Sequence, residues 1–319
     1  MKKRHVISTL LVLTAILVIS MGLFIFLGLN EKNVAYYLPK RLLKVGTVII
    51  VSFCIGYSSV TFQTITNNTI LTPSVIGLDS LYLFIQTIVV YLFGSKTLSM
   101  LVGVPNFIIS VGFMIVGSYL LFFLLFRGHS KNIYFLVLAG MVFGSLFGGM
   151  STFMQVLLDP NEFSVLEGRM FASFSKINED LFYICLIICI VIIFSVWKDN
   201  RKLDVISLGQ EHAVSLGVNY HRIVLKQLLI ISVLVSISTV LVGPITFLGI
   251  IIVSLGRKMI KDYRHSYRII ATVLIGSIAL SVGLLIVERV LHFTTTISVI
   301  INFVGGIYFL WLLIKERNV

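Results

Sequence analysis

The sequence predicts an all-α protein that crosses a membrane many times. Hydrophobic residues make up 58% of the 319 positions, and charged residues make up only 12%. A soluble domain usually carries about 25% charged residues, because these cover its surface. The hydrophobic residues also fall into long runs, and a membrane-spanning helix needs about 20 apolar residues. Both observations argue against a soluble enzyme.

Ten apolar runs follow one another, and each is expected to form one span of a single transmembrane domain covering 1–319. The first run is too long for the apolar region of a signal peptide, so we expect it to be retained. Gly243 and Pro244 alone separate the seventh and eighth runs, which predicts that one of them is short, broken or re-entrant. The runs are residues 6–29, 42–63, 76–93, 99–126, 133–156, 181–197, 223–243, 245–256, 269–290 and 297–314.

The basic residues predict the orientation of these spans. With the N-terminus placed inside, seventeen of the 25 Lys and Arg residues fall in inside segments. Cytoplasmic loops collect such residues, so the net charge of +12 reflects topology rather than nucleic-acid binding. An even number of spans then places both termini in the cytoplasm, in a multi-pass protein of the cell membrane.

Few residues suggest chemistry inside the membrane. Cys54, Cys185 and Cys189 lie within apolar runs, and two thiols one helical turn apart make a poor metal site without other ligands. We therefore expect this chain to bind no metal or cofactor. All six His residues lie in terminal or loop regions, which predicts no buried base for an intramembrane enzyme.

One polar segment, residues 207–222, lies between two apolar runs. Leu208 and Leu216 are helically spaced, and Gly217 can end a short helix in the left-handed conformation. A second short turn is expected over 218–222. Two small helices are more than a hairpin between spans requires, so this segment is a candidate site for a soluble partner.

Three motifs carry a family resemblance. Residues 63–77 read QTITNNTILTPSVIG, residues 208–217 read LGQEHAVSLG, and residues 242–257 read VGPITFLGIIIVSLGR. They are similar to the patterns Q-x-x-x-x-N-P-L-A-x-P-x-x-L-G, L-G-x-x-x-A-x-x-L-G and A-G-P-I-x-F-V-G-L-x-x-P-H-x-x-R. Together they resemble the FecCD-type permease of ABC importers for iron–siderophore complexes, haem and vitamin B12, which implies a BtuC-like fold. The matching structural positions are Gln63, Asn68, Pro73, Gly77, Gly243, Pro244, Gly249 and Arg257.

The chain departs from the family patterns at a few positions. Thr69 stands where the family usually has Pro, and Val253 with Ser254 replaces the usual Pro-His pair. These differences limit any transfer of substrate identity. They also point to a subunit that pairs with a different, related permease.

The resemblance implies an import function without catalysis by this chain. The permease would move an iron–siderophore complex inward, using ATP and Mg²⁺ bound by two separate cytoplasmic ATPase subunits. Its other partners would be a homologous permease subunit, the lipid bilayer and an external substrate-binding protein. Haem and cobalamin are alternative ligands. A different class, the ion-driven secondary transporter, would need an ionisable residue such as Asp79, although that carboxylate can also cap its helix.

The resemblance also assigns two contact sites. The coupling loop, residues 198–222, would sit in a groove of the ATPase, with Leu208, Ala213, Leu216 and Gly217 inside the groove. Gly209 belongs to the same motif, and Gln210, Glu211 and His212 would contact the groove's rim. On the outside, Lys40, Arg41 and Arg289 would meet acidic groups of the binding protein. Alternatively, these cations anchor lipid phosphates, or Arg289 pairs with Glu288.

Overall fold

The computed structural model describes residues 2–29, 33–100, 103–126, 133–175 and 177–317, and these form helices joined by turns. The elements are α1 (Lys2–Phe26), α2 (Val34–Ile65), the 3₁₀ helix η1 (Pro73–Ile76), α3 (Leu78–Met100), α4 (Val104–Phe126), α5 (Ile133–Val156), α6 (Pro160–Met170), α7 (Glu179–Val196), α8 (Asn200–Ile206), α9 (Gln210–Ser215), α10 (Tyr220–Val242), α11 (Leu248–Met259), α12 (His265–Arg289) and α13 (Ile297–Arg317).

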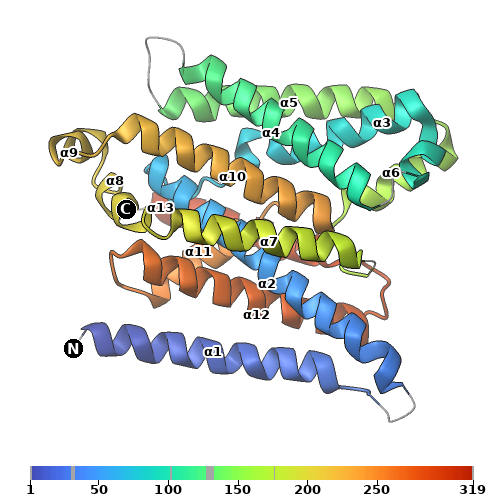
Figure 1. The fold of residues 1–319 in the computed structure, drawn as a ribbon, viewed down its shortest axis with the longest axis horizontal. Helices are drawn as coiled ribbons and strands as arrows, with labels where there is room; N and C mark the ends of the chain where they lie inside the picture. Colours follow the sequence, from blue (N-terminus) through green and yellow to red (C-terminus); the bar gives the residue numbers. More distant parts are fainter. Residues whose placement is uncertain (1, 30–32, 101–102, 127–132, 176, 318–319) are drawn as a thin grey trace.

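The long helices run roughly side by side along the longest axis of the molecule (Figure 1). Both chain ends, α8 and α9 lie at one end of this bundle, and α6 lies at the opposite end. This arrangement agrees with the prediction that both termini and residues 207–222 lie on the same side of the protein. That this side is cytoplasmic stays a prediction from the basic residues.

The helices support a multi-pass membrane protein. Within the described residues, α1, α2, α5, α7, α10 and α12 are long and apolar enough to cross a membrane. Shorter apolar stretches lie in α3, α4 and α13. The remaining predicted span corresponds to α11, which has 12 residues and is only about 18 Å long. All ten predicted runs thus coincide with a helix, whereas the count of ten complete crossings stays a prediction.

The break between α10 and α11 confirms the expectation drawn from Gly243 and Pro244. Gly243 ends α10 with a φ of 100°, and α11 begins only at Leu248. A Cβ atom on Gly243 would lie 2.8 Å from the Cα atom of Ala172, so the chain approaches its neighbour closely here. The amide of Phe247 donates to Asn302 Oδ1 on α13 at 3.5 Å, which gives the unwound backbone a partner.

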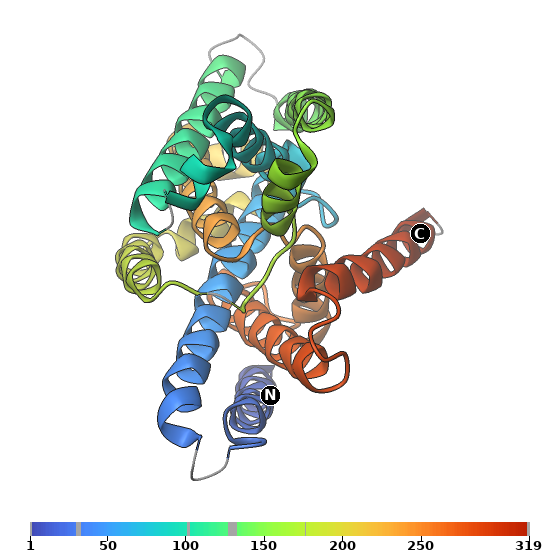
Figure 2. The same cartoon turned by 90° about the vertical axis from the view of Figure 1, so that its right-hand side faces the viewer.

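The central helix of the bundle is α2, which packs against α7, α10, α11 and α12. Figure 2 shows α1 and α13 at the edges of the molecule. Helix α1 is joined to α12 through a hydrogen bond of 2.9 Å between the hydroxyl groups of Ser20 and Ser281. Helix α2 has 32 residues and is about 48 Å long, which exceeds the roughly 30 Å hydrocarbon core.

The segment after α2 turns back into the bundle. It includes η1 and ends at Gly77, which has a φ of 84° and contacts the backbone of Gly144 on α5. A Cβ atom on Gly144 would lie 2.8 Å from the Cα atom of Gly77. Gly144 therefore lets the two segments approach closely, whereas Cβ atoms on Gly148 and Gly149 of the same helix would meet open space.

Candidate functional site

Two short helices, α8 and α9, form the end of the bundle that also carries both termini (Figure 1). Gly217 follows α9 with a φ of 79°, which confirms the predicted left-handed end. The predicted second short turn over 218–222 is not a separate helix, because α10 already begins at Tyr220. Asn219 caps that helix by accepting a hydrogen bond of 3.3 Å from the amide of Arg222. The second short helix is α8, on the other side of α9.

Three apolar side chains of this loop face outward. Leu208 and Val214 are each 56% exposed, and Leu216 is 62% exposed. Exposed apolar side chains in an otherwise polar loop are candidates for contact with a partner. We call Leu208, Val214 and Leu216 with the exposed Gln210, Glu211, His212 and Gly217 the coupling surface. Ala213 was expected to contact a partner but is fully buried, so it packs into the permease itself, while Val214 was missed.

The coupling surface is fastened to the long helices. Leu203 and Ile206 of α8 form a small apolar cluster with Ile223 of α10. Beside it, buried Asp199 accepts hydrogen bonds from Lys226 of α10 and, at 3.3 Å, from Lys202 of α8. These contacts hold α8 and the residue before it against the start of α10.

A second fastening joins α8 to α12 and α2. Asp204 Oδ1 accepts hydrogen bonds from the backbone amide of His265 at 2.7 Å and from its ring Nδ1 at 2.6 Å. The ring Nε2 lies 2.8 Å from Thr64 Oγ1 on α2. His265 is fully buried, so the prediction that no histidine base is buried is wrong. Asp204 is 61 positions away in the chain, and sequence patterns carry no signal for such a pair.

The first and third family motifs meet at this end of the bundle. Gln63 is buried near the end of α2, and its Oε1 accepts a hydrogen bond from Arg257 Nη2 near the end of α11. Asn68 turns the chain by accepting a bond of 2.9 Å from the amide of Ile70. Gly249 packs against the side chain of Ser59, leaving no room for a Cβ atom.

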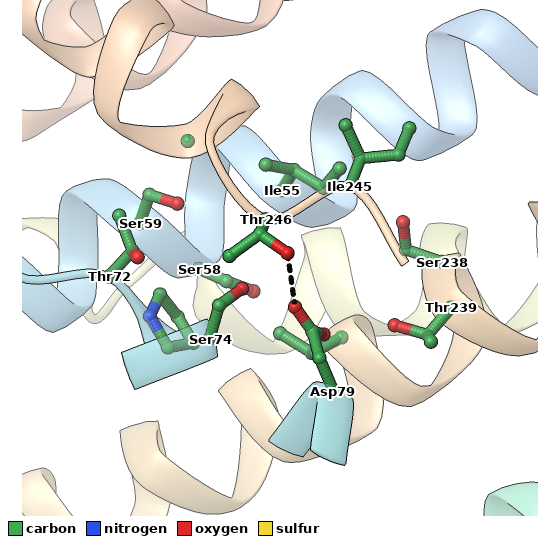
Figure 3. Close-up of a pocket in the computed structure, with 13 residues that line it drawn as sticks. Ile55, Ser58, Ser59, Thr72, Ser74, Asp79, Ser238, Thr239, Ile245 and Thr246 are labelled. Atoms are coloured by element: carbon green, nitrogen blue, oxygen red, sulfur yellow. Dashed lines mark hydrogen bonds between the residues drawn. The ribbon is translucent and has the colours of Figure 1, made fainter. Parts of the chain in front are cut away.

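Further inside the bundle, the same motifs enclose a small pocket of about 20 Å³ around Asp79 (Figure 3). Thr246, just before α11, donates a hydrogen bond of 3.3 Å to Asp79 Oδ2. Asp79 lies in the first turn of α3, where the helix dipole favours a negative charge. Ser238 and Thr239 line the pocket from the last turns of α10.

The three cations predicted to lie outside have different contacts. Arg41 is only 7% exposed, and its Nη1 donates to the carbonyl groups of Ile25 and Leu27 at 2.7 and 2.8 Å. Its Nη2 lies 3.2 Å from Glu288 Oε1 on α12. Arg41 therefore clamps α1 and α12 to α2, and a docking role for its side chain is not supported.

The side chains of Lys40 and Arg289 are exposed, so the structure leaves both accessible to a partner. Lys40 Nζ lies 2.6 Å from the hydroxyl group of Tyr36. Arg289 Nη2 donates to the carbonyl group of Leu27, and among the described residues Glu288 pairs with Arg41 and Lys44 instead of Arg289. Lys40 precedes the predicted span 42–63 but already lies on α2, which begins at Val34.

The three cysteines face other helices. All are buried, and the sulfur atoms of Cys54 on α2 and Cys189 on α7 lie 3.7 Å apart. Within the described part of the chain, no group of three or more His, Cys, Asp and Glu residues is arranged to hold a metal ion.

Known proteins resemble this chain in sequence and in fold. The model of the FecCD transport family matches residues 6–315. The petrobactin import system permease protein YclO of Bacillus subtilis (strain 168) is 49% identical over 306 residues, covering 96% of both chains. The petrobactin import system permease protein FatC of Bacillus anthracis is 32% identical over 318 residues, covering 99% of this chain and 90% of the relative.

A solved structure shows the same fold. It is a chain of an ABC transporter described as metal-chelate type, in an inward-facing conformation, and it aligns with a TM-score of 0.82. The alignment covers 97% of this chain and 99% of the other at 22% identity. This similarity agrees with the BtuC-like permease fold that the motifs led us to expect.

Proposed function

The chain belongs to the FecCD transport family, and on that basis we propose that it is the membrane permease of an ABC importer for an iron–siderophore complex. The observation that carries this proposal is the 49% identity to the petrobactin import permease YclO across 96% of both chains. A ferric siderophore of the petrobactin type is therefore the first ligand to test. Haem and cobalamin are the competing ligands.

The coupling surface supplies the mechanism. We assign no catalytic role to the permease. Two cytoplasmic ATPase subunits would bind ATP and Mg²⁺, hydrolyse the ATP, and move the permease through contacts with this surface. Leu208, Val214 and Leu216 would enter a groove of the ATPase, surrounded by the polar Gln210 and Glu211. Because α8 is fastened to α10 and α12, displacement of this loop would move those helices as rigid bodies.

The remaining partners are proposed on the same basis. A homologous permease would complete a central path, with an external binding protein docking at Lys40 and Arg289. Helix α5 exposes a stripe of apolar side chains, including Leu138, Val142 and Leu146, which faces either that partner or lipid. Both termini and the coupling surface would be cytoplasmic, as the basic residues predict.

Transport by the full complex tests this function. The permease, its partner permease and the ATPase are reconstituted in liposomes, and uptake of ⁵⁵Fe-petrobactin is measured with the binding protein added outside. We expect uptake that requires ATP in the ATPase compartment and stops when an ATPase variant cannot hydrolyse it. Uptake driven by an ion gradient without ATP would refute the ABC mechanism. Uptake of haem or cobalamin, without petrobactin, would refute the ligand.

A further inference from the structure

The pocket around Asp79 contains more oxygen atoms than its own hydrogen bonds use. Ser58 and Thr72 are 0% and 2% exposed. Among the described residues, Ser58 Oγ and Thr72 Oγ1 have no hydrogen-bond partner. Leaving a buried hydroxyl group unpaired costs free energy, so these two oxygens are available to a bound species. The hydroxyl residues that line the pocket are Ser58, Ser59, Thr72, Ser74, Ser238, Thr239 and Thr246.

The pocket also lacks a positive charge from the protein. Asp79 is half-buried in an apolar bundle, and among the described residues no Lys, Arg or His forms an ion pair with it. A carboxylate at membrane depth is costly without a counter-charge. The positive N-terminal end of the α3 dipole also lies at this carboxylate, because Asp79 is in the first turn of that helix.

The C-terminal end of α10 favours a cation next to that carboxylate. Ser238 and Thr239 lie close to the C-terminal end of α10, where the helix dipole is negative. The positive end of α3 and the negative end of α10 therefore meet at one pocket. Broken helices inside membranes use such ends, together with unwound backbone, to hold ions.

The residues that line the pocket differ in exposure. Ser58, Thr72, Ser238 and Thr239 are buried, whereas Ser74, Asp79 and Thr246 are partly exposed. An ion would enter by way of the partly exposed residues. The volume of about 20 Å³ exceeds the roughly 10–15 Å³ that one water-sized particle requires.

We propose that this pocket binds one small monovalent cation, with oxygen ligands from Asp79, Ser58, Thr72 and Thr246. Na⁺ fits the single negative charge, whereas Ca²⁺ sites in proteins usually combine several carboxylates. The cation would pin the segment before α3 to α2 and to the start of α11. This is a fixed ion of the permease, separate from the imported ligand, and the inference does not depend on which chelate is carried.

Thermal unfolding of the full-length permease in lipid nanodiscs tests this site. Na⁺ is titrated at constant ionic strength, with choline as the replacing cation. Wild-type protein is expected to show a saturable rise in Tm of about 2–4 °C, because an ion bound only to the folded state stabilises it. Asp79→Asn keeps the size of the side chain and an acceptor for Thr246, and it should abolish the rise.

Two further variants make the result specific. Asp180→Asn alters an exposed carboxylate in the first turn of α7 and should leave the Na⁺ response unchanged. Thr72→Val keeps the charge but removes one unpaired hydroxyl group, and should raise the Na⁺ concentration at half-maximal effect about three- to tenfold. If the Asp79→Asn protein does not insert into the membrane, the Thr72→Val variant tests the site in its place.

Three outcomes would overturn the proposal. The first is a wild-type Tm that does not respond to Na⁺, K⁺ or Li⁺ at constant ionic strength. The second is a Na⁺ response that persists in both Asp79→Asn and Thr72→Val. The third is a wild-type Tm that responds to pH alone, which would mean that a proton rather than a metal cation neutralises Asp79.

Discussion

His265 Nδ1 lies 2.6 Å from Asp204 Oδ1, and this contact joins the short helix α8 to the first turn of α12. The same imidazole ring contacts Thr64 at the end of α2. One buried side chain therefore connects the coupling loop with two of the longest helices in the bundle. If the coupling loop transmits motion, this contact is one route by which it does so.

Replacing Asp204 with Ala should weaken that connection. The change leaves the ring and the amide of His265 without their acceptor, a loss of about 1–3 kcal/mol for a buried group. We expect ferric siderophore uptake to fall several-fold while ATP hydrolysis by the complex continues. Asp204→Asn keeps one acceptor and should recover part of the uptake. Equal loss of uptake and ATPase activity in both variants would indicate failed assembly rather than failed coupling.

Gly217→Arg should abolish uptake while the protein still inserts. Gly217 is exposed at the end of α9, and nothing lies within 4 Å of where its Cβ atom would be. The isolated permease therefore has space for a side chain, but a tight ATPase groove does not. Gly217→Asn is the control, because Asn tolerates the left-handed conformation that a φ of 79° requires. Co-purification of the ATPase is measured for both variants, and normal co-purification with Arg would argue against the groove.

Lys40 and Arg41 should respond differently to substitution. Arg41→Ala leaves Glu288 and two carbonyl groups without their partner, and we expect it to destabilise the protein by about 3 kcal/mol. Lys40→Glu should leave Tm unchanged and weaken binding of the substrate-binding protein, more at low salt than at high salt. Tm and binding at two salt concentrations distinguish the roles, and a salt-independent loss in Lys40→Glu would contradict docking at this site.

Gly144→Ala should destabilise the protein much more than Gly148→Ala on the same helix. A methyl group at position 144 would lie 2.8 Å from the Cα atom of Gly77, and backbone cannot move aside cheaply. We expect a loss of about 1–3 kcal/mol from this overpacking. Position 148 has open space, so its substitution should be nearly neutral. Tm in nanodiscs compares the two, and equal values would mean that this close approach does not stabilise the fold.

The sequence predicted the helices well because their signal is local. An apolar run of about 20 residues needs no partner to be recognised, and the Gly243–Pro244 break is visible in two adjacent letters. The left-handed Gly217 also follows from its immediate neighbours. None of these features depends on how the helices are arranged around one another.

The details of the candidate sites depend on helix phase and on distant contacts, which the sequence does not display. Lys40 and Arg41 are adjacent in the sequence, and both were expected to meet the binding protein. In the structure they lie on α2, where a step of one residue turns by about 100°, so one side chain faces solvent and the other Glu288. The same step separates buried Ala213 from exposed Val214. Asp204 and His265 are separated in the chain by α9, α10 and α11, and only the tertiary arrangement brings them into contact.

The length of α2 links the two faces of the protein. One continuous helix carries Thr64, beside His265, near one end and Arg41, bound to Glu288, near the other. If the coupling surface moves as proposed, a displacement near Thr64 would reach Arg41 along one continuous helix. Pro39 lies inside α2, two residues before Arg41. Its ring leaves one helical backbone hydrogen bond unmade, so α2 can bend most easily at this position.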